Sequence, residues 1–300
     1  MEVFSKEQIK QSIDSLKNFN EIIDSQKVAF IDFYNNLYEV PLPMQFVFSE
    51  LKSDCHIKGG YKHGSSSLYV KIANSSPLGN NGSIFVFNVN TGQLKTILHD
   101  AGFLTTLRTA IAGILLVDYV KWNIKKIGII GNGNLATQLH SLAVRKYPKT
   151  DIMVFARDKA KASSITNSTC DTVDNLLTNC DVIFTATASK SPIINHLPKG
   201  VNKMIIALGS DDIYKSEVSP SLYGEADLII TDNKSQAVKF GDIAKAIKNK
   251  IINLDSTIEF GKFLKSDIPT NTKTIIADFS GIGAQDVAIS EFVLNRLARY

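Results

Sequence analysis

Two patterns of hydrophobic and polar residues follow one another along this chain. Between residues 44 and 99, short segments alternate between apolar and polar side chains, which is typical of strands with one buried face. Beyond Lys126, short and wholly apolar runs alternate with amphipathic stretches, which is typical of strands buried on both faces and separated by helices. The change of pattern predicts two domains of different architecture.

The start of the chain predicts two helices. Ser5 and Gln8 have the spacing of a capping box. The apolar residues that recur at helical spacing after it are Ile9, Ile13 and Leu16. A second helix is predicted over residues 21–38, with the prolines at positions 41 and 43 ending it.

Consecutive strands are predicted next, over residues 44–48, 56–61, 68–73, 83–89 and 93–99. The sequence Asn-Thr-Gly at positions 90–92 predicts a hairpin turn. Ile84 and Val86 point away from Phe85 and Phe87, so both faces of their strand are apolar. We expect an antiparallel sheet, followed by a helix over residues 104–122.

The second half predicts a doubly wound α/β fold. Its apolar strands are expected at residues 126–131, 151–156, 181–187, 203–209, 227–232 and 274–279. Helices are predicted between them, one ending at Lys146 and one near Lys159. Alternating strands and helices of this kind form a parallel sheet covered on both faces.

Gly131-x-Gly133-x-x-Ala136 comes directly after the first of these strands and opens a helix, as in a dinucleotide-binding turn. Gly131 permits the tight turn, Gly133 lets a pyrophosphate approach, and Ala136 lets helix and strand pack closely. The N–H groups of Asn134 and Leu135 in the first helical turn would face the phosphates. A Gly-rich turn without a cofactor is the alternative.

Arg157 and Asp158 follow the next strand, where an acidic residue normally binds the ribose hydroxyls of NAD. Arg157 could bind a 2′-phosphate, which favours NADP, while Asp158 keeps NAD open. Arg157 as a solvated loop residue is the alternative.

Several segments together resemble the ornithine cyclodeaminase/mu-crystallin family. They are DCHIKGG at 54–60, VKI at 70–72, LTTLRTA at 104–110, the glycine motif, TATAS at 185–189, ALGSD at 207–211 with KSE at 215–217, and DFSG at 278–281. The resemblance implies a homodimer with an α+β substrate-binding and dimerisation domain at 1–115, completed by a returning last helix at 285–300. It also implies a Rossmann domain at 116–284.

The resemblance further implies hydride exchange between a nicotinamide and the α-carbon of an amino or imino acid. Carried over position by position, Lys71 and Arg108 match substrate-carboxylate binders, and Lys71 also counts as catalytic. Asp211 matches the acid–base residue. Thr187 and Ser280 fall where the family lines the nicotinamide and ribose.

One departure concerns the segment before the first strands, where many family members have an arginine. This chain has Gln45 there, and Lys58 is the expected substitute. The missing arginine puts strict ornithine chemistry in doubt.

The residue types suit the chemistry independently. A planar Arg108 can grip a carboxylate with two hydrogen bonds, while Lys71 adds a compact charge. Asp211 could stabilise an iminium and relay a proton. Without the family, Lys71 would be interpreted as a solvent-facing strand residue, Arg108 as an ordinary ion-pair partner, and Asp211, beside Asp212, as a turn cap.

Composition narrows the remaining classes. The 33 basic and 29 acidic residues among 300 are scattered, so neither a nucleic-acid surface nor a disordered chain is predicted. The longest apolar run, residues 110–117, is shorter than the ~20 residues of a membrane span. Three separated cysteines favour a reducing, cytoplasmic location, and the absence of CxxC and HExxH gives no metal site.

The sequence therefore favours an NAD(P)-dependent amino-acid dehydrogenase or imine reductase acting on a small substrate. A cyclodeaminase, which closes a cyclic imino acid such as proline and releases ammonia, needs the same carboxylate binders. A third possibility is a protein that binds NADPH and a ligand without useful turnover, as the resemblance to mu-crystallin permits.

Overall fold

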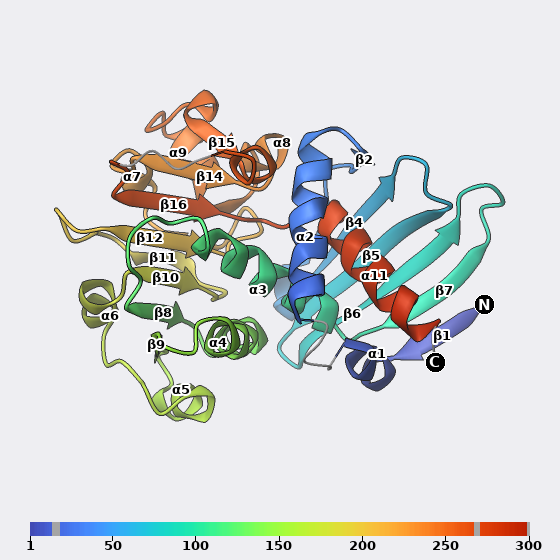
Figure 1. Ribbon diagram of the computed structural model, residues 1–300, viewed down its shortest axis with the longest axis horizontal. Coiled ribbons are helices and arrows are strands. Elements are labelled where there is room, and N and C mark those ends of the chain that lie inside the picture. The colour runs from blue at the N-terminus through green and yellow to red at the C-terminus, as the bar shows by residue number, and fades with distance from the viewer. Residues whose placement is uncertain (14–18, 267–270, 299–300) are drawn as a thin grey trace. The chain divides into compact units, whose positions relative to one another are not determined.

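The computed structural model describes residues 1–13, 19–266 and 271–298 (Figure 1). The chain forms two compact units: Met1–Arg108 with Ile282–Tyr300, called unit 1, and Thr109–Gly281, called unit 2. The division falls within helix α3 (Phe103–Val117). Within the described part of the chain, no helix is both long and apolar enough to cross a bilayer.

Unit 1 contains a seven-stranded sheet in the order β1-β7-β6-β5-β4-β2, with β3 also paired to β4. Its strands are β1 (Glu2–Ser5), β2 (Tyr38–Glu39), β3 (Met44–Phe48), β4 (Ser53–Lys62), β5 (Ser67–Ser76), β6 (Gly79–Asn88) and β7 (Leu94–His99). All five predicted strands are present. Gly92, with a φ of 69°, lies in the predicted turn between β6 and β7.

The strands predicted over residues 44–99 pair antiparallel as expected, and β1, which lies outside that segment, pairs with β7 in parallel. The strands β1 and β2 were not predicted, since segments this short carry too little alternation to identify them. The remaining neighbours, from β7 to β2, pair antiparallel as expected.

Helices α1 (Lys6–Ile13) and α2 (Phe19–Tyr34) correspond to the two predicted at the start of the chain. The capping box is confirmed: the Ser5 N–H donates to Gln8 Oε1 at 2.9 Å, and the Gln8 N–H donates to Ser5 Oγ at 3.4 Å. Leu16 lies outside the described residues.

The predicted end of the second helix is wrong. It ends at Tyr34 because Asn36 adopts a left-handed φ of 60°, and Tyr38 already belongs to β2. The prolines at 41 and 43 therefore do not end it. A short 3-10 helix, η2 (Ser49–Leu51), connects β3 to β4.

The C-terminal helix α11 (Gly283–Leu297) lies with α2 across one face of the unit 1 sheet (Figure 1). The approach is close at two glycine positions. A Cβ on Gly283 would overlap the carbonyl oxygen of Gly59, and a Cβ on Gly60 would lie 2.7 Å from Val287 Cγ2. Glycine at these positions lets the first turn of α11 rest directly on β4.

Unit 2 contains a parallel sheet in the order β15-β14-β16-β12-β10-β8-β9. The strands are β8 (Lys126–Ile130), β9 (Asp151–Phe155), β10 (Val182–Thr185), β12 (Lys203–Ala207), β14 (Leu228–Thr231), β15 (Thr257–Glu259) and β16 (Thr274–Asp278). All six predicted strands are present, and β15 is additional. A separate parallel pair, β11 (Lys190–Ile194) and β13 (Ser216–Val218), was not predicted either.

Helices cover both faces of this sheet. They are α4 (Asn134–Lys146), α5 (Lys159–Ile165), α6 (Val173–Asn179), α7 (Pro220–Tyr223), α8 (Lys234–Ala237), α9 (Gly241–Lys248) and α10 (Phe260–Phe263), with the 3-10 helix η3 (Leu254–Ser256). On one face, Leu176 of α6 and Ile243 of α9 join the same core as Ile183 of β10. The next residue along β10, Phe184, points to the other face and packs against Gly113 of α3.

Helix α3 ends at Val117 rather than at the predicted position 122. Its last turn tightens, with the Tyr119 N–H donating to the carbonyl of Leu116 at 3.1 Å. At its other end, Asp100 Oδ2 accepts the Leu104 N–H at 2.6 Å and caps the first turn.

Candidate active site

A buried cluster of charged side chains lies between the sheet of unit 1 and its helix α11. Lys71 Nζ of β5 lies 2.8 Å from Asp286 Oδ1, and Arg108 Nε lies 3.2 Å from the same oxygen. These three side chains are each at most 4% exposed. Lys71 is therefore not a solvent-facing strand residue, so the alternative interpretation of Lys71 is wrong. Arg108 is buried as well.

Gln285, the neighbour of Asp286, fixes the orientation of Arg108. Its Oε1 accepts from Arg108 Nη1 at 3.3 Å, and its Nε2 donates to the Arg108 carbonyl at 3.1 Å. Gln26 of α2 in turn donates to the Gln285 carbonyl. The guanidinium is thus held along one side by α11, and a planar group held in this way presents a defined edge to a ligand.

A third basic side chain belongs to this cluster. Lys58 of β4 is also buried, so three basic side chains are grouped around the carboxylate of Asp286. Burial lowers the pKa of Lys71 to about 7. The charge of Asp286 raises this pKa, while the charges of Arg108 and Lys58 lower it. Burial raises the pKa of Asp286, but Lys71 and Arg108 outweigh it and hold that pKa below its ordinary value. These basic side chains could also receive the carboxylate of a ligand.

Gln45, which stands where the resemblance led us to expect an arginine, lies beside His56. Gln45 Nε2 and His56 Nε2 are 3.0 Å apart, and Asp54 is 3.6 Å from the same imidazole. This contact joins β3 to β4. Gln45 thus contributes a neutral side chain to its strand pair.

In unit 2, the glycine motif has the geometry that a dinucleotide needs. Gly131 has a φ of 138°, and a Cβ there would overlap the carbonyl oxygen of Ala186. A Cβ on Gly133 would meet no atom within 4 Å, so packing among the described residues does not require glycine at that position. No described side chain caps α4, whose first residues are Asn134 and Leu135. The residues therefore fit a bound pyrophosphate, which explains both features.

Arg157 and Asp158 differ in their surroundings at the end of β9. The Asp158 carboxylate caps α5, since its Oδ1 accepts the Lys161 N–H at 3.2 Å. Arg157 is exposed. Asp158 therefore stabilises the start of α5, while Arg157 is accessible to a charged ligand.

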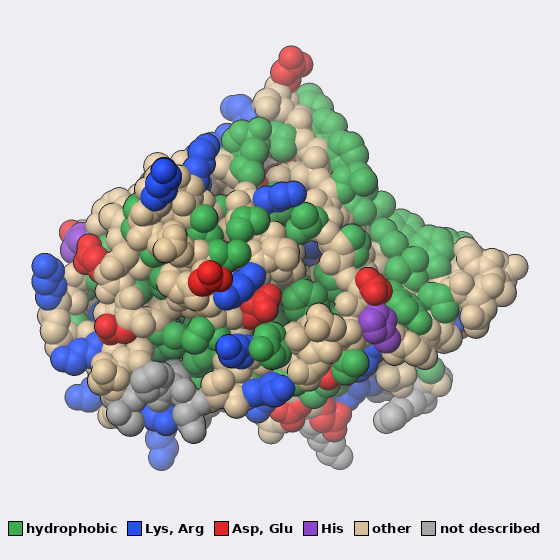
Figure 2. Space-filling model, turned by 90° about the horizontal axis from the view of Figure 1, so that it is seen from above, with side chains coloured by type: hydrophobic (Ala, Val, Ile, Leu, Met, Phe, Trp, Pro, Cys, Tyr) green, Lys and Arg blue, Asp and Glu red, His purple; other side chains and the backbone are tan. Residues whose placement is uncertain are grey.

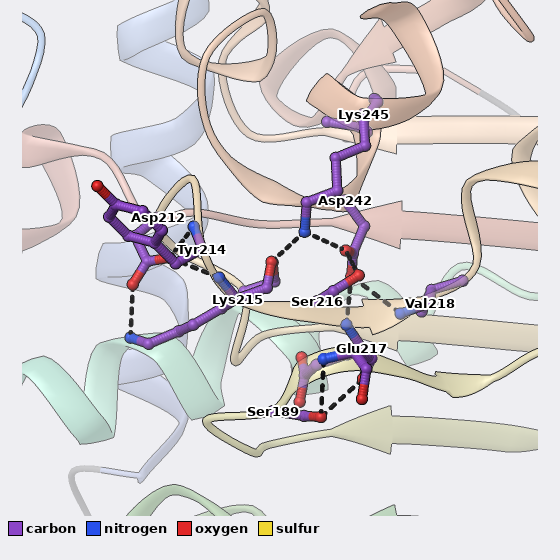
Figure 3. Close-up of polar contacts among 12 residues, drawn as sticks. Ser189, Asp212, Tyr214, Lys215, Ser216, Glu217, Val218, Asp242 and Lys245 are labelled. Carbon is purple, nitrogen blue, oxygen red and sulfur yellow. Dashed lines mark hydrogen bonds and ion pairs between the residues drawn. The ribbon is translucent and has the colours of Figure 1, made fainter. Parts of the chain in front are cut away.

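Asp211 and Asp212 follow β12, and both lie within ion-pair distance of Lys215. Figure 3 labels Asp212 with Tyr214 and Lys215. Asp212 Oδ1 accepts the N–H groups of Tyr214 and Lys215 at 2.6 and 2.7 Å, so Asp212 is the turn cap. Asp211 Oδ1 forms an ion pair of 2.6 Å with Lys215 Nζ, and about a third of its side chain is exposed. The turn-cap alternative considered for Asp211 belongs to its neighbour.

Thr187 and Ser280 both contact buried carboxylates of unit 2. Thr187 Oγ1 donates to Glu217 Oε1 at 2.8 Å. Ser280 Oγ accepts from Gln236 Nε2 at 2.8 Å and lies 3.5 Å from Asp232. Burial raises the pKa of Glu217 to about 7. Both hydroxyls are therefore held in place by their surroundings.

Sequence patterns did not indicate that Gln285, Asp286 and Glu217 belong to these clusters. Glu217 is part of a quoted motif, but nothing in its spacing indicated the side chains it contacts. Asp286 lies 215 positions from Lys71 along the chain, so only the fold brings the two together.

An open parallel sheet with a glycine-rich turn after its first strand defines a dinucleotide-binding protein. The chain belongs to the ornithine cyclodeaminase/mu-crystallin family, which matches residues 61–299. The predicted family is confirmed.

Known proteins of similar sequence and structure agree with this assignment. The iminosuccinate reductase of Paracoccus denitrificans is 28% identical over 79% of each chain. The structure resembles an archaeal alanine dehydrogenase dimer with bound NAD (TM-score 0.86, 20% identity, 99% of this chain and 96% of that one). It also resembles Thermococcus litoralis Δ1-pyrroline-2-carboxylate reductase with NADH and L-proline (TM-score 0.85, 18% identity, 100% and 98%). The predicted fold class is confirmed.

Proposed function

We propose that the protein is an NAD(P)-dependent oxidoreductase that exchanges hydride between the cofactor and the α-carbon of a small amino or imino acid. The buried grouping of Lys58, Lys71 and Arg108 near Asp286 carries this proposal. Reductases and a dehydrogenase of amino and imino acids among its relatives support it. The two units remain our proposed substrate-binding and cofactor-binding domains.

Unit 1 binds the substrate carboxylate in this proposal. Arg108 offers the edge of its guanidinium that lies away from Nε, because Nε faces Asp286. Lys71 and Lys58 add charge within a site from which water is largely excluded. Fixing the carboxylate orients the α-carbon hydrogen, and such positioning contributes up to about 7–11 kcal/mol.

Unit 2 binds the cofactor, whose nicotinamide supplies or accepts the hydride. Gly131, Gly133, Asn134 and Leu135 hold the pyrophosphate, while Thr187 and Ser280 line the nicotinamide and ribose. Asp211 stabilises the positive charge that develops on the substrate nitrogen and exchanges a proton with it. Asp211 Oδ1 lies 2.6 Å from Lys215 Nζ.

A panel of amino acids and of keto acid and amine pairs, assayed with both cofactors, tests the proposal. Net oxidation or reduction of the nicotinamide, followed by absorbance, is the expected result. Ammonia release without net cofactor change would identify a cyclodeaminase, an activity that shares the same carboxylate binders. Tight cofactor binding with neither signal would identify a ligand-binding protein and overturn the proposal.

We expect the protein to bind NADP(H) at least as well as NAD(H), because Arg157 is exposed and Asp158 is engaged as a helix cap. Replacing Arg157 with Ala should weaken NADPH binding, measured by fluorescence titration, while NADH binding changes little. Lys161→Ala, one turn further along α5, is the control and should not alter this preference. A wild-type protein that prefers NADH tenfold would contradict the assignment.

We also expect a homodimer formed through the unit 1 sheet. The sheet face that points away from α11 carries half-buried apolar side chains, among them Ile57, Val70 and Phe85. Met44, Phe46 and Phe48 of β3 are each about half exposed, at 46–56%. Figure 2 shows a continuous band of hydrophobic side chains. Apolar surface of this extent is typical of an interface.

Light scattering should report twice the chain mass at micromolar concentration, and Phe85→Lys should shift the protein towards monomers. A wild-type monomer at that concentration would rule the interface out. A cytoplasmic location is part of the proposal as well, because all three cysteines are free thiols.

A further inference from the structure

Glu217 of β13 is a fully buried carboxylate surrounded by hydrogen-bond donors. Its Oε1 accepts from Thr187 N at 2.6 Å and from Thr187 Oγ1 at 2.8 Å. Its Oε2 accepts from Thr185 Oγ1 at 2.7 Å and from Gly209 N at 2.8 Å. Four donors therefore meet the two oxygens, and a carboxylate is an acceptor able to satisfy all of them.

These donors come from two adjacent strands of the sheet. Thr185 ends β10 and Thr187 follows it, whereas Gly209 lies just after β12 and two positions before Asp211. The two segments touch, because a Cβ on Gly209 would overlap the carbonyl oxygen of Thr187. Both leave the carboxyl edge of the sheet, where dinucleotides bind in folds of this kind.

The backbone that carries Glu217 is itself fixed (Figure 3). Asp242 Oδ2 accepts the N–H groups of Glu217 and Val218 at 2.7 and 2.9 Å. Asp242 Oδ1 accepts from Ser216 Oγ at 2.6 Å. The Glu217 side chain is therefore anchored at its base and bound at its tip, so it acts as a rigid connection between the two segments.

We propose that Glu217 is a positioning residue for the nicotinamide end of the cofactor, holding Thr187 and the segment that leads to Asp211 in fixed relation. The inference rests on the proposed function. It differs from a purely structural role in which part of the cofactor site it affects. Among the described residues, Glu217 binds Thr187 and Gly209 directly, whereas it touches the pyrophosphate turn only through Ala186, and that turn is also anchored to β9 by the Gly131 N–H, which donates to the Phe155 carbonyl at 2.9 Å. Loss of Glu217 should disturb the nicotinamide rather than the rest of the dinucleotide.

The test compares Glu217→Gln with the wild type at mildly alkaline pH. An amide turns an N–H group towards some of the four donors, so at least one contact becomes repulsive. We expect kcat to fall at least about tenfold, the effect of about 1.4 kcal/mol on the barrier. Binding of NADPH should weaken relative to 2′-phospho-ADP-ribose, which lacks the nicotinamide ring.

A matched control is available at the opposite edge of the same sheet. Asp181 Oδ2 accepts the N–H groups of Lys125 and Lys126 at 2.7 and 3.1 Å, joining β10 to β8 through a carboxylate. Asp181→Asn should lower the unfolding temperature while leaving kcat and the ratio of the two affinities unchanged.

A second pair of variants keeps the test informative if Glu217→Gln does not fold. Thr185→Val removes one donor and should lower kcat, whereas Thr185→Ser keeps the hydroxyl and should restore it. If the binding of NADPH and the binding of 2′-phospho-ADP-ribose weaken equally, with kcat unchanged, the inference is overturned. If the wild type turns over no substrate, the proposed function fails, but the ratio of affinities still decides the role of Glu217.

Discussion

Replacing Asp211 with Asn should lower kcat by roughly 10²–10⁴-fold, the usual effect of removing a general acid–base group. Asparagine keeps the shape of the side chain but can neither accept a proton nor balance a cationic nitrogen. The ion pair with Lys215 Nζ, 2.6 Å away, also depends on the charge of Asp211. Cofactor affinity, measured by fluorescence, should change little, because the pyrophosphate turn is formed by other residues.

Asp212→Asn is the matched control for this prediction. Asp212 is the turn cap that binds the N–H groups of Tyr214 and Lys215. Its loss should appear mainly in the unfolding temperature, with kcat reduced by much less than in Asp211→Asn. Near-normal turnover in Asp211→Asn on the best substrate would contradict the acid–base role, and the family-based assignment at that position would be withdrawn.

Replacing Arg108 with Lys should raise KM for the substrate by roughly ten- to hundredfold, since hydrogen bonds to charged groups contribute about 1.5–3 kcal/mol each. Lysine keeps the charge but loses the planar fork that can bind Asp286, Gln285 and a substrate carboxylate at the same time. Lys71→Ala should affect both KM and kcat, because a poorly held carboxylate is also poorly oriented.

Steady-state kinetics at saturating cofactor would measure both changes. Arg145→Lys, the same exchange on helix α4 of the other unit, should leave KM unaltered. Circular dichroism and cofactor binding would establish that Arg108→Lys remains folded. An unchanged KM in that variant would exclude Arg108 from substrate binding.

The fold was largely predictable because its two halves have different periods. The short strands and the hairpin turn between residues 44 and 99 predicted an antiparallel sheet, and the apolar runs after Lys126 predicted buried parallel strands. Strands β1, β2, β13 and β15 escaped prediction because each spans at most four residues. Strand β11, with the sequence KSPII, lacks the apolar pattern of the predicted strands. The early end of α2 depends on the left-handed conformation of Asn36, which apolar spacing does not reveal.

Lys71, Arg108 and Asp211 could be singled out because each stands in a recognisable motif, and their roles stay predictions. The site was not predictable where a partner arrives through packing. Asp286 reaches Lys71 because Gly60 and Gly283 let helix and strand touch. Those glycines are visible in the sequence, but the surfaces they bring together are not.

The division of unit 1 into two distant segments has a consequence for its biosynthesis. During translation, residues 1–108 leave the ribosome long before Asp286, with the whole of unit 2 between them. Lys71 and Arg108 lack this counter-ion until then, and burying unpaired charges is strongly unfavourable. The amino-terminal sheet therefore cannot close over its charged cluster on its own. A nascent chain should complete its continuous dinucleotide-binding unit first and its amino-terminal unit last.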